Sequence, residues 1–366
     1  MEPPIEDTVR LLNPRTWALG SLMLCKVLED GCNLPSDTVC SWRDTGDTYY
    51  LQRRDDVKDD ITTGGDPTAG RLANSKFHRA NWNLGQDTFC KAKVWVEGLT
   101  TEADTIKWVN KHIPSLPTPE IIYTWTDVKL CRTITLTKRV SGKLLRDAWI
   151  DLDCSQQHHL ADQIANHLKL LSVWESEYIE TVLHAGFPCS CGEAWSLRER
   201  EALPAVIPRL EPRVPREEYE KFVTRRNAHL GITVSPPDFG EPLILQHLQC
   251  TPQDVFVEMP TAEGEMPKVT AIFGWSHVAY FPKYKVATNP RESGYFGALA
   301  HRKFRIGDDH WRWMLSNACV RLGFPLAFEY AKAHSRVEHK DYVGIPIEYL
   351  VSHDHLVQDE DHVDIE

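Results

Sequence analysis

The sequence predicts an α+β protein of two lobes, the first rich in strands and the second rich in helices. The chain has 366 residues, 42% hydrophobic and 25% charged, which is enough for two hydrophobic cores. Residues 88–96 alternate in polarity as a half-buried strand does, whereas residues 156–174 repeat apolar side chains at helical spacing. This change of period places the second lobe after residues 140–142.

The first lobe is expected to contain a strand, a helix and a hairpin. The strand covers residues 88–96, and its odd-numbered positions share one face. Thr100 or Thr101 can cap the following helix, which ends at the prolines of residues 114–119. The runs 120–125 and 131–140 are rich in β-branched residues and read as paired strands. The face of the first strand that is opposite Cys90, Ala92 and Val94 carries Phe89, Lys91, Lys93 and Trp95.

The second lobe is expected to be mainly helical. Apolar periodicity predicts helices at 156–174, 216–230 and 309–335, with a proline-rich surface connection at 203–215. Two short strands are expected between the later helices, together with a hairpin around residues 260–267. These strands cover residues 243–249 and 268–275.

The first eighty residues and the last fifteen show weaker patterns. The aspartate-rich segment 55–60 and the Gly/Thr/Pro segment 62–70 favour a long surface loop over packed elements. The last fifteen residues carry six carboxylates and no Lys or Arg, as a solvated, disordered tail does. We therefore divide the chain into an N-terminal segment, two lobes and a tail, with the boundaries 1–80, 81–139, 140–350 and 351–366.

Composition excludes several classes of partner. The formal charge of −11 argues against nucleic-acid binding, which needs a basic face. The acidic N-terminus does not resemble a secretory signal, and no run of eighteen apolar residues predicts a membrane span, so a cytoplasmic location is expected. Of the ten cysteines only Cys189 and Cys191 lie close together, and that spacing is not a zinc ribbon, so no metal site is expected. The oligomeric state stays open.

Two stretches resemble the amino-terminal lobe of fungal phosphotransferase-family proteins related to aminoglycoside and choline kinases. They are residues 89–125 and 136–149, and the resemblance continues at 245–257 and 272–284. It implies a protein-kinase-like, aminoglycoside phosphotransferase-like fold with a small β-rich N-lobe and a larger helical C-lobe. It also implies a hinge near Val140 to Gly142 and a ligand held between the lobes.

The resemblance assigns residues to nucleotide binding, one position at a time. Lys91 or Lys93 lies where a strand lysine neutralises nucleotide phosphates, and Glu102 on the next helix would pair with it if nucleotide is bound. The alternative is that the lysines face solvent from an edge strand. His247 matches the loop histidine of the family, which usually has a structural role.

The residues that perform phosphoryl transfer in this family are replaced. Gln249 stands at the catalytic aspartate, Asp254 at the metal-binding asparagine, and Gly274 at the second metal-binding aspartate. Ser276 replaces the following glutamate. Phosphoryl transfer needs a carboxylate to orient the acceptor and oxygen ligands to hold metal ions. Ordinary ATP-dependent transfer is therefore not expected.

The replaced positions remain polar, which favours a repurposed site, although drift after loss of activity would leave a similar pattern. The leading hypothesis is a protein without metal or other cofactor that binds a small, largely apolar metabolite, such as a cyclase or isomerase of fungal secondary metabolism. A residual small-molecule phosphotransferase and a noncatalytic pseudokinase scaffold remain alternatives, and whether the chain is an enzyme stays open. The candidate catalytic residues are Gln249, Asp254 and His277. The candidate pocket residues are His247, Gly274, Trp275 and Ser276.

Overall fold

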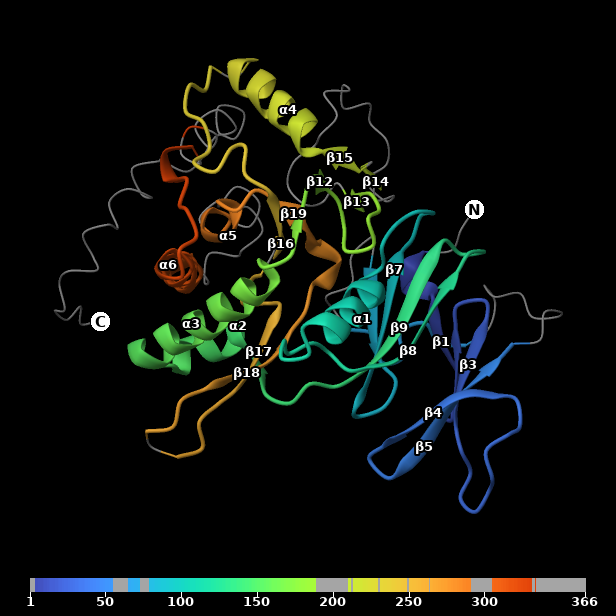
Figure 1. Ribbon diagram of the computed structural model, residues 1–366. Coiled ribbons are helices and arrows are strands. Elements are labelled where there is room, and N and C mark those ends of the chain that lie inside the picture. The colour runs from blue at the N-terminus through green and yellow to red at the C-terminus, as the bar shows by residue number, and fades with distance from the viewer. Residues whose placement is uncertain are drawn as a thin grey trace.

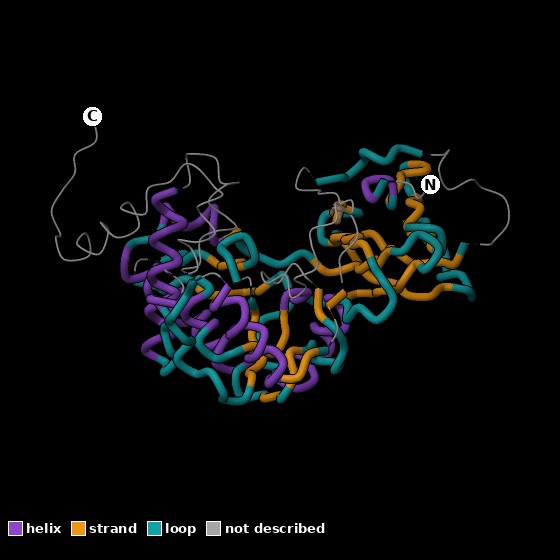
Figure 2. Tube along the Cα trace, turned by 90° about the horizontal axis from the view of Figure 1, so that it is seen from above, coloured by secondary structure: helices purple, strands orange, loops and turns teal. Residues whose placement is uncertain are grey.

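The chain forms a β-rich half followed by a helix-rich half. The computed structural model describes residues 4–54, 65–72, 79–188, 210–211, 213–229, 231–248, 250–262, 264–290, 305–330 and 333. Figure 1 shows the strands of the first half beside the helices of the second, and the view from above in Figure 2 separates them in the same way. The predicted two-lobed α+β architecture is confirmed.

An antiparallel sheet of five strands, in the order β1-β2-β3-β5-β4, occupies the beginning of the chain. The sequence patterns predicted no elements for residues 9–53, and the part of the predicted surface loop at 55–64 lies outside the described residues. The strands are joined by tight turns, so their alternation of polar and apolar residues is interrupted after a few residues. Thr45 and Gly46 both have positive φ values, 49° and 101°, as the two-residue turn between β4 and β5 requires. The elements are η1 (Ile5–Asp7), β1 (Val9–Asn13), β2 (Thr16–Leu19), β3 (Met23–Val27), β4 (Thr38–Asp44) and β5 (Asp47–Arg53).

A second antiparallel sheet of four strands, in the order β6-β7-β9-β8, contains the predicted strand and hairpin. Helix α1 connects β7 to β8, and Thr101 caps it by accepting a hydrogen bond from the backbone N of Asp104. The elements are β6 (Arg79–Asn83), β7 (Thr88–Val94), α1 (Glu102–His112), β8 (Ile121–Asp127) and β9 (Arg132–Lys138).

The two sheets share one hydrophobic core. Leu19 and Leu51 of the first sheet and Trp82 and Ile134 of the second are fully buried within it. Buried carboxylates also join the sheets: Asp127 accepts hydrogen bonds from Ser21 N at 2.5 Å and Ser21 Oγ at 2.8 Å. The inner face of β7 is therefore committed to packing, which leaves its other face for the site.

The second half combines helices with short strands. The predicted helices at 156–174 and 216–230 are present as α3 and α4, whereas the predicted helix 309–335 is α6, which ends at Arg321. Gly323 (φ +93°) and Pro325 follow α6 and end it, and residues 328–330 are helical again. The helices are α2 (Leu145–Ala148), η2 (Trp149–Asp151), α3 (Cys154–Leu171), α4 (Arg216–His229), η4 (Trp275–His277), α5 (Lys285–Thr288) and α6 (Arg305–Arg321).

The short strands of this half position two loops. Strands β16 and β19 pair with each other, and β17 and β18 form the hairpin expected around residues 260–267. The strands are β10 (Lys143–Leu144), β11 (Glu175–Ser176), β12 (Tyr178–Ile179), β13 (Phe187–Pro188), β14 (Leu210–Glu211), β15 (Val214–Pro215), β16 (Leu243–His247), β17 (Val255–Glu258), β18 (Lys268–Ile272) and β19 (Val278–Phe281).

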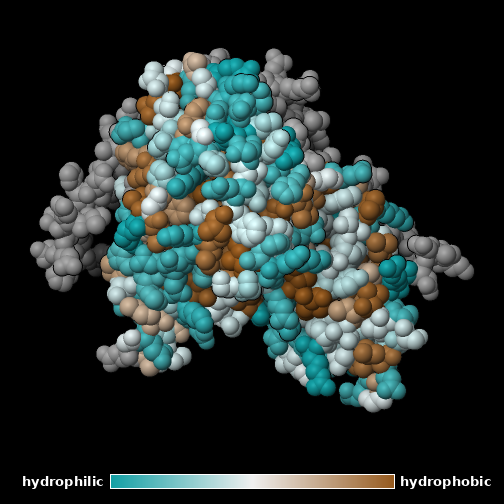
Figure 3. Space-filling view, in the orientation of Figure 1, coloured by the Kyte–Doolittle hydropathy of each residue, from teal (hydrophilic) through white to brown (hydrophobic). Residues whose placement is uncertain are grey.

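The outer surface is mixed in polarity. Figure 3 shows a largely hydrophilic face on which apolar residues form small separate patches. Among the described residues, no helix has both the length and the apolar character needed to cross a membrane.

Candidate functional site

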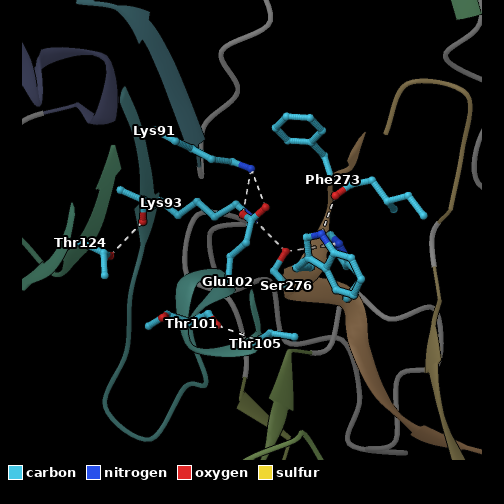
Figure 4. Close-up of polar contacts among 12 residues, drawn as sticks. Lys91, Lys93, Thr101, Glu102, Thr105, Thr124, Phe273 and Ser276 are labelled. Carbon is cyan, nitrogen blue, oxygen red and sulfur yellow. Dashed lines mark hydrogen bonds and ion pairs between the residues drawn. The ribbon is translucent and has the colours of Figure 1, made fainter. Parts of the chain in front are cut away.

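Two lysines of β7 share one carboxylate on α1. Lys91 Nζ lies 3.0 Å from Glu102 Oε1 and 2.8 Å from Oε2, and Lys93 Nζ lies 2.8 Å from Oε2 (Figure 4). The side chains of Lys91, Lys93 and Glu102 are 24%, 17% and 11% exposed. The capping box of Thr101 fixes the first turn of α1, where Glu102 lies. Both lysines are therefore paired and partly buried, so the alternative of solvent-facing lysines is wrong.

The shared carboxylate makes this group electrostatically unusual. Burial by itself raises the pKa of Glu102, but the charges of Lys91 and Lys93 outweigh burial and hold that pKa far below its usual range. Burial lowers the pKa of Lys93 to about 8, with Glu102 opposing the shift and Lys91 adding to it. Glu102 is therefore ionised, and Lys93 remains mostly protonated at pH 7 with a pKa of about 8.

A hydrogen bond joins this group to the second half of the chain. Lys93 Nζ donates to Ser276 Oγ at 2.7 Å, and Ser276 Oγ lies 3.3 Å from His277 Nδ1. Ser276 and His277 belong to η4 in the second half. Figure 4 shows Ser276 facing Lys93 of the first half. Burial, with the charge of Lys93, lowers the pKa of His277 to about 3, so its imidazole is neutral at physiological pH.

The loop after β16 and the loop between β18 and β19 lie side by side. His247 Nε2 donates to the carbonyl oxygen of Phe273 at 2.8 Å, and the backbone N of Phe273 donates to the carbonyl oxygen of Asp254 at 2.6 Å. Because Nε2 carries the proton in this bond, Nδ1 of the neutral ring is an acceptor, and it is buried without a hydrogen-bond partner. His247 is 6% exposed, and burial lowers its pKa. Gln249, between these residues in sequence, lies outside the described residues.

Gly274 stands at the position where the resemblance implies a magnesium carboxylate. Its φ of +81° is in the left-handed region, and a Cβ added there would lie 3.2 Å from Asp254 Oδ1 and 3.3 Å from His247 Cε1. Asp254 is held by Thr251, whose Oγ1 donates to Oδ2 at 2.6 Å, and burial raises the pKa of Asp254. The site therefore has one carboxylate here where the family pattern has two metal ligands.

Trp275 is buried and packs against His247. Its side chain is 1% exposed, its Nε1 donates to the carbonyl oxygen of Ile272 at 2.5 Å, and its ring meets that of His247 edge-on at 5.4 Å. A ring buried in this way packs in the core and orients His247. The role of Trp275 in a ligand pocket stays a prediction.

The described residues contain no group of three or more His, Cys, Asp and Glu side chains that could hold a metal ion. The groups that converge are two ammonium groups, the Glu102 carboxylate, the Ser276 hydroxyl and the His277 imidazole. Such groups can form hydrogen bonds to a ligand and transfer protons. No local sequence pattern indicates the contact between Lys93 and Ser276, because it joins segments 183 residues apart.

The chain is similar in structure to aminoglycoside phosphotransferases. A GDP and kanamycin complex of APH(2'')-IIia has 13% sequence identity and a TM-score of 0.43, covering 77% of this chain and 86% of that one. A ternary complex of a thermostable mutant of APH(4)-Ia with AMP-PNP and hygromycin B has 14% identity and a TM-score of 0.39, covering 78% and 97%. APH(3'')-Id from Streptomyces rimosus has 14% identity and a TM-score of 0.41, covering 74% and 92%. No protein-family model and no curated protein sequence matches the chain.

Proposed function

We propose that this chain binds a small, largely apolar metabolite beside Lys93, Ser276 and His277, and catalyses a non-redox rearrangement of it without magnesium or nucleotide. Cyclisation and isomerisation are the reaction classes that need only shape and a few positioned proton donors and acceptors. The observation that carries this proposal is Gly274, which offers no metal ligand and whose backbone leaves little room for one beside Asp254. We further propose that this reaction is part of fungal secondary metabolism.

The proton-transfer groups support such a reaction. Lys93, with a pKa of about 8, can give or take a proton near neutral pH, and it contacts Ser276 directly. His277 is neutral and can accept a hydrogen bond through the ring nitrogen facing Ser276. Asp254 has one oxygen held by Thr251, while its Oδ1 faces Gly274. In this proposal Gln249 supplies a further hydrogen bond to the ligand.

One observation favours a second candidate, a residual ATP-dependent phosphotransferase acting on a small molecule. The pairing of a strand lysine with a helix glutamate is the arrangement that kinases use to hold nucleotide phosphates. Without a carboxylate at 274, that reaction would lack the charge stabilisation on which phosphoryl transfer depends. A noncatalytic scaffold would keep the lysine–glutamate pair but turn over no ligand.

The test is to incubate the purified protein with a panel of polyenes and terpenoids, with and without ATP and magnesium, and to follow them by liquid chromatography and mass spectrometry. A cyclisation or isomerisation changes retention time at constant mass. We expect such a product without ATP, and we expect Lys93→Met to abolish it. A product that gains a phosphoryl group only with ATP and magnesium would establish the second candidate. Binding without conversion of any compound would favour the scaffold.

A further inference from the structure

A cavity of about 240 Å³ lies in the second half of the chain, and no residue of the candidate site lines it. It opens where the ends of α3 and α6 meet strand β16. Its volume is below the roughly 300–1,000 Å³ of sites that hold drug-sized ligands, so it suits a smaller molecule. We propose that this cavity binds a small zwitterion, namely an α-amino acid with an apolar side chain. This site is separate from the proposed function and does not depend on it.

The carboxyl ends of two helices form one wall of the cavity. Helices α3 and α6 pack against each other, as Figure 1 shows, and Arg321 Nη2 donates to Asp162 Oδ1 at 2.5 Å between them. Lys169 in the last turn of α3 and Leu322 directly after α6 line the cavity. Because helix packing sets this wall, the cavity is in place before a ligand binds, as sites for small molecules usually are.

The floor of the cavity is apolar. Ile244 of β16 and Phe324 line it, and each is 5% exposed. Phe324 returns to the core because Gly323, with a φ of +93°, turns the chain after α6. Glu175 of β11 is the register partner of Ile244, which places their side chains on the same face of the sheet. An apolar ligand group can therefore lie on the floor while a charged group of the same ligand meets Glu175.

Two lysines and two glutamates line the cavity, so the formal charge of its lining is zero. They are Lys169, Glu175, Glu241 and Lys283. Among the residues that the structure describes, none of the four takes part in an ion pair. A ligand with one carboxylate and one ammonium group complements both kinds of charge, whereas a simple anion or cation leaves one kind unpaired. The lining therefore favours a zwitterion.

A buried carboxylate holds Glu241 and Lys283 on neighbouring turns. The backbone N of Glu241 donates to the carbonyl oxygen of Asp238 at 3.2 Å, and the backbone N of Tyr284, next to Lys283, donates to Asp238 Oδ2 at 2.7 Å. Burial raises the pKa of Asp238, and Glu241 adds to this shift while Lys283 opposes it, as two charges near that carboxylate do. We therefore assign Lys283 to the carboxylate of the ligand and Glu241 to its ammonium group.

The experiment measures the affinity of the full-length protein for L-leucine and for two analogues that keep its branched apolar group. One analogue, 4-methylpentanoate, lacks the ammonium group, and the other, 3-methylbutylamine, lacks the carboxylate. Titrations followed by ligand-observed NMR give the three dissociation constants. We expect L-leucine to bind at least about tenfold more tightly than either analogue, because each analogue lacks one charge-assisted hydrogen bond.

Two variants and two matched controls locate the binding. Glu241→Gln and Lys283→Met should each weaken L-leucine binding about tenfold, and Lys283→Met should also remove the preference for L-leucine over 3-methylbutylamine. Glu258→Gln and Lys268→Met are the controls, because these two exposed residues are register partners in β17 and β18 and do not line the cavity. Both controls should bind L-leucine as the unchanged protein does.

Three results would overturn the inference: no binding of L-leucine, equal affinity for the three compounds, or equal affinity of all four variants for L-leucine. Lys93→Met separates this inference from the proposed function, since it should abolish the rearrangement but leave L-leucine binding unchanged. Loss of L-leucine binding in Lys93→Met would place the amino acid at the candidate site and would also overturn the inference.

Discussion

At the scale of single residues, the proposed function depends most on position 274. The left-handed backbone and the 3.2 Å approach to Asp254 Oδ1 both favour glycine. The sequence shows that position 274 offers no carboxylate, because glycine has no side chain. The lack of space for a larger side chain at position 274 is visible only in the structure. It depends on how the loop of Gly274 packs against the loop of Asp254.

Gly274→Ala tests this crowding. We expect it to destabilise the protein by about 2–3 kcal/mol, combining about 1 kcal/mol for the left-handed conformation with the displacement of Asp254. Gly264→Ala is the matched control, because Gly264 has a φ of +84° and no atom within 4 Å of an added Cβ. Denaturant unfolding of both variants measures the difference. Equal losses in the two variants would show that Asp254 does not crowd position 274.

Lys93 makes a second prediction at this scale, through the dependence of stability on pH. Its pKa falls from 10.5 to about 8 on folding, so between these values the unfolded chain binds the proton and the folded chain does not. The free energy of unfolding should therefore rise with pH across this window, by about 1–3 kcal/mol. The rise should be absent from Lys93→Met when both proteins are unfolded with denaturant from pH 7.5 to 10.5. If the free energy of unfolding changes with pH in the same way in both proteins, the lowered pKa of Lys93 is contradicted.

At the scale of elements, prediction from sequence succeeds where the pattern is local. Strand β7, the Thr101 cap of α1 and the hairpin β8–β9 each lie within a short window and follow polarity, capping or β-propensity rules. The five-stranded sheet was missed because its strands are short and joined by tight turns. Its burial pattern also depends on packing against the second sheet, which no local window contains.

Asp44 provides an element-scale prediction, because it ties that first sheet to the second. This carboxylate is 3% exposed and accepts hydrogen bonds from the backbone N atoms of Gln86 and Asp87, each at 3.0 Å, and from Thr88 Oγ1 at 2.8 Å. Asp44→Ala leaves these buried donors unpaired and should cost about 2–4 kcal/mol in the free energy of unfolding.

The control for Asp44 is Asp47→Ala, which changes an exposed carboxylate at the other end of the same turn. We expect that change to stay within about 0.5 kcal/mol. Thermal unfolding of the two variants, read in parallel, makes the comparison. A loss at Asp44 no larger than that at Asp47 would mean that the hydrogen bonds of Asp44 do not help to hold the sheets together.

At the scale of the whole molecule, the two halves meet through α1, whose Ile106 and Val109 pack into the core of the second half, and through the hydrogen bond between Lys93 and Ser276. The candidate residues on each side of this contact could be selected from the sequence, because motif spacing is local. Their meeting could not, since a contact between distant segments depends on how the lobes dock. The lysine–glutamate group and the two loops around Gly274 together form a site with cations and proton donors but no second metal carboxylate.

The most direct test of the central claim is the free energy of unfolding in the presence of ATP. It is measured by denaturant unfolding at increasing ATP concentrations, with and without magnesium. A magnesium-dependent site of micromolar Kd would add about 4 kcal/mol to the free energy of unfolding at about 1 mM ATP. Because position 274 has no carboxylate, we predict no magnesium-dependent stabilisation. A gain of about 4 kcal/mol that requires magnesium and disappears in Lys93→Met would contradict the account.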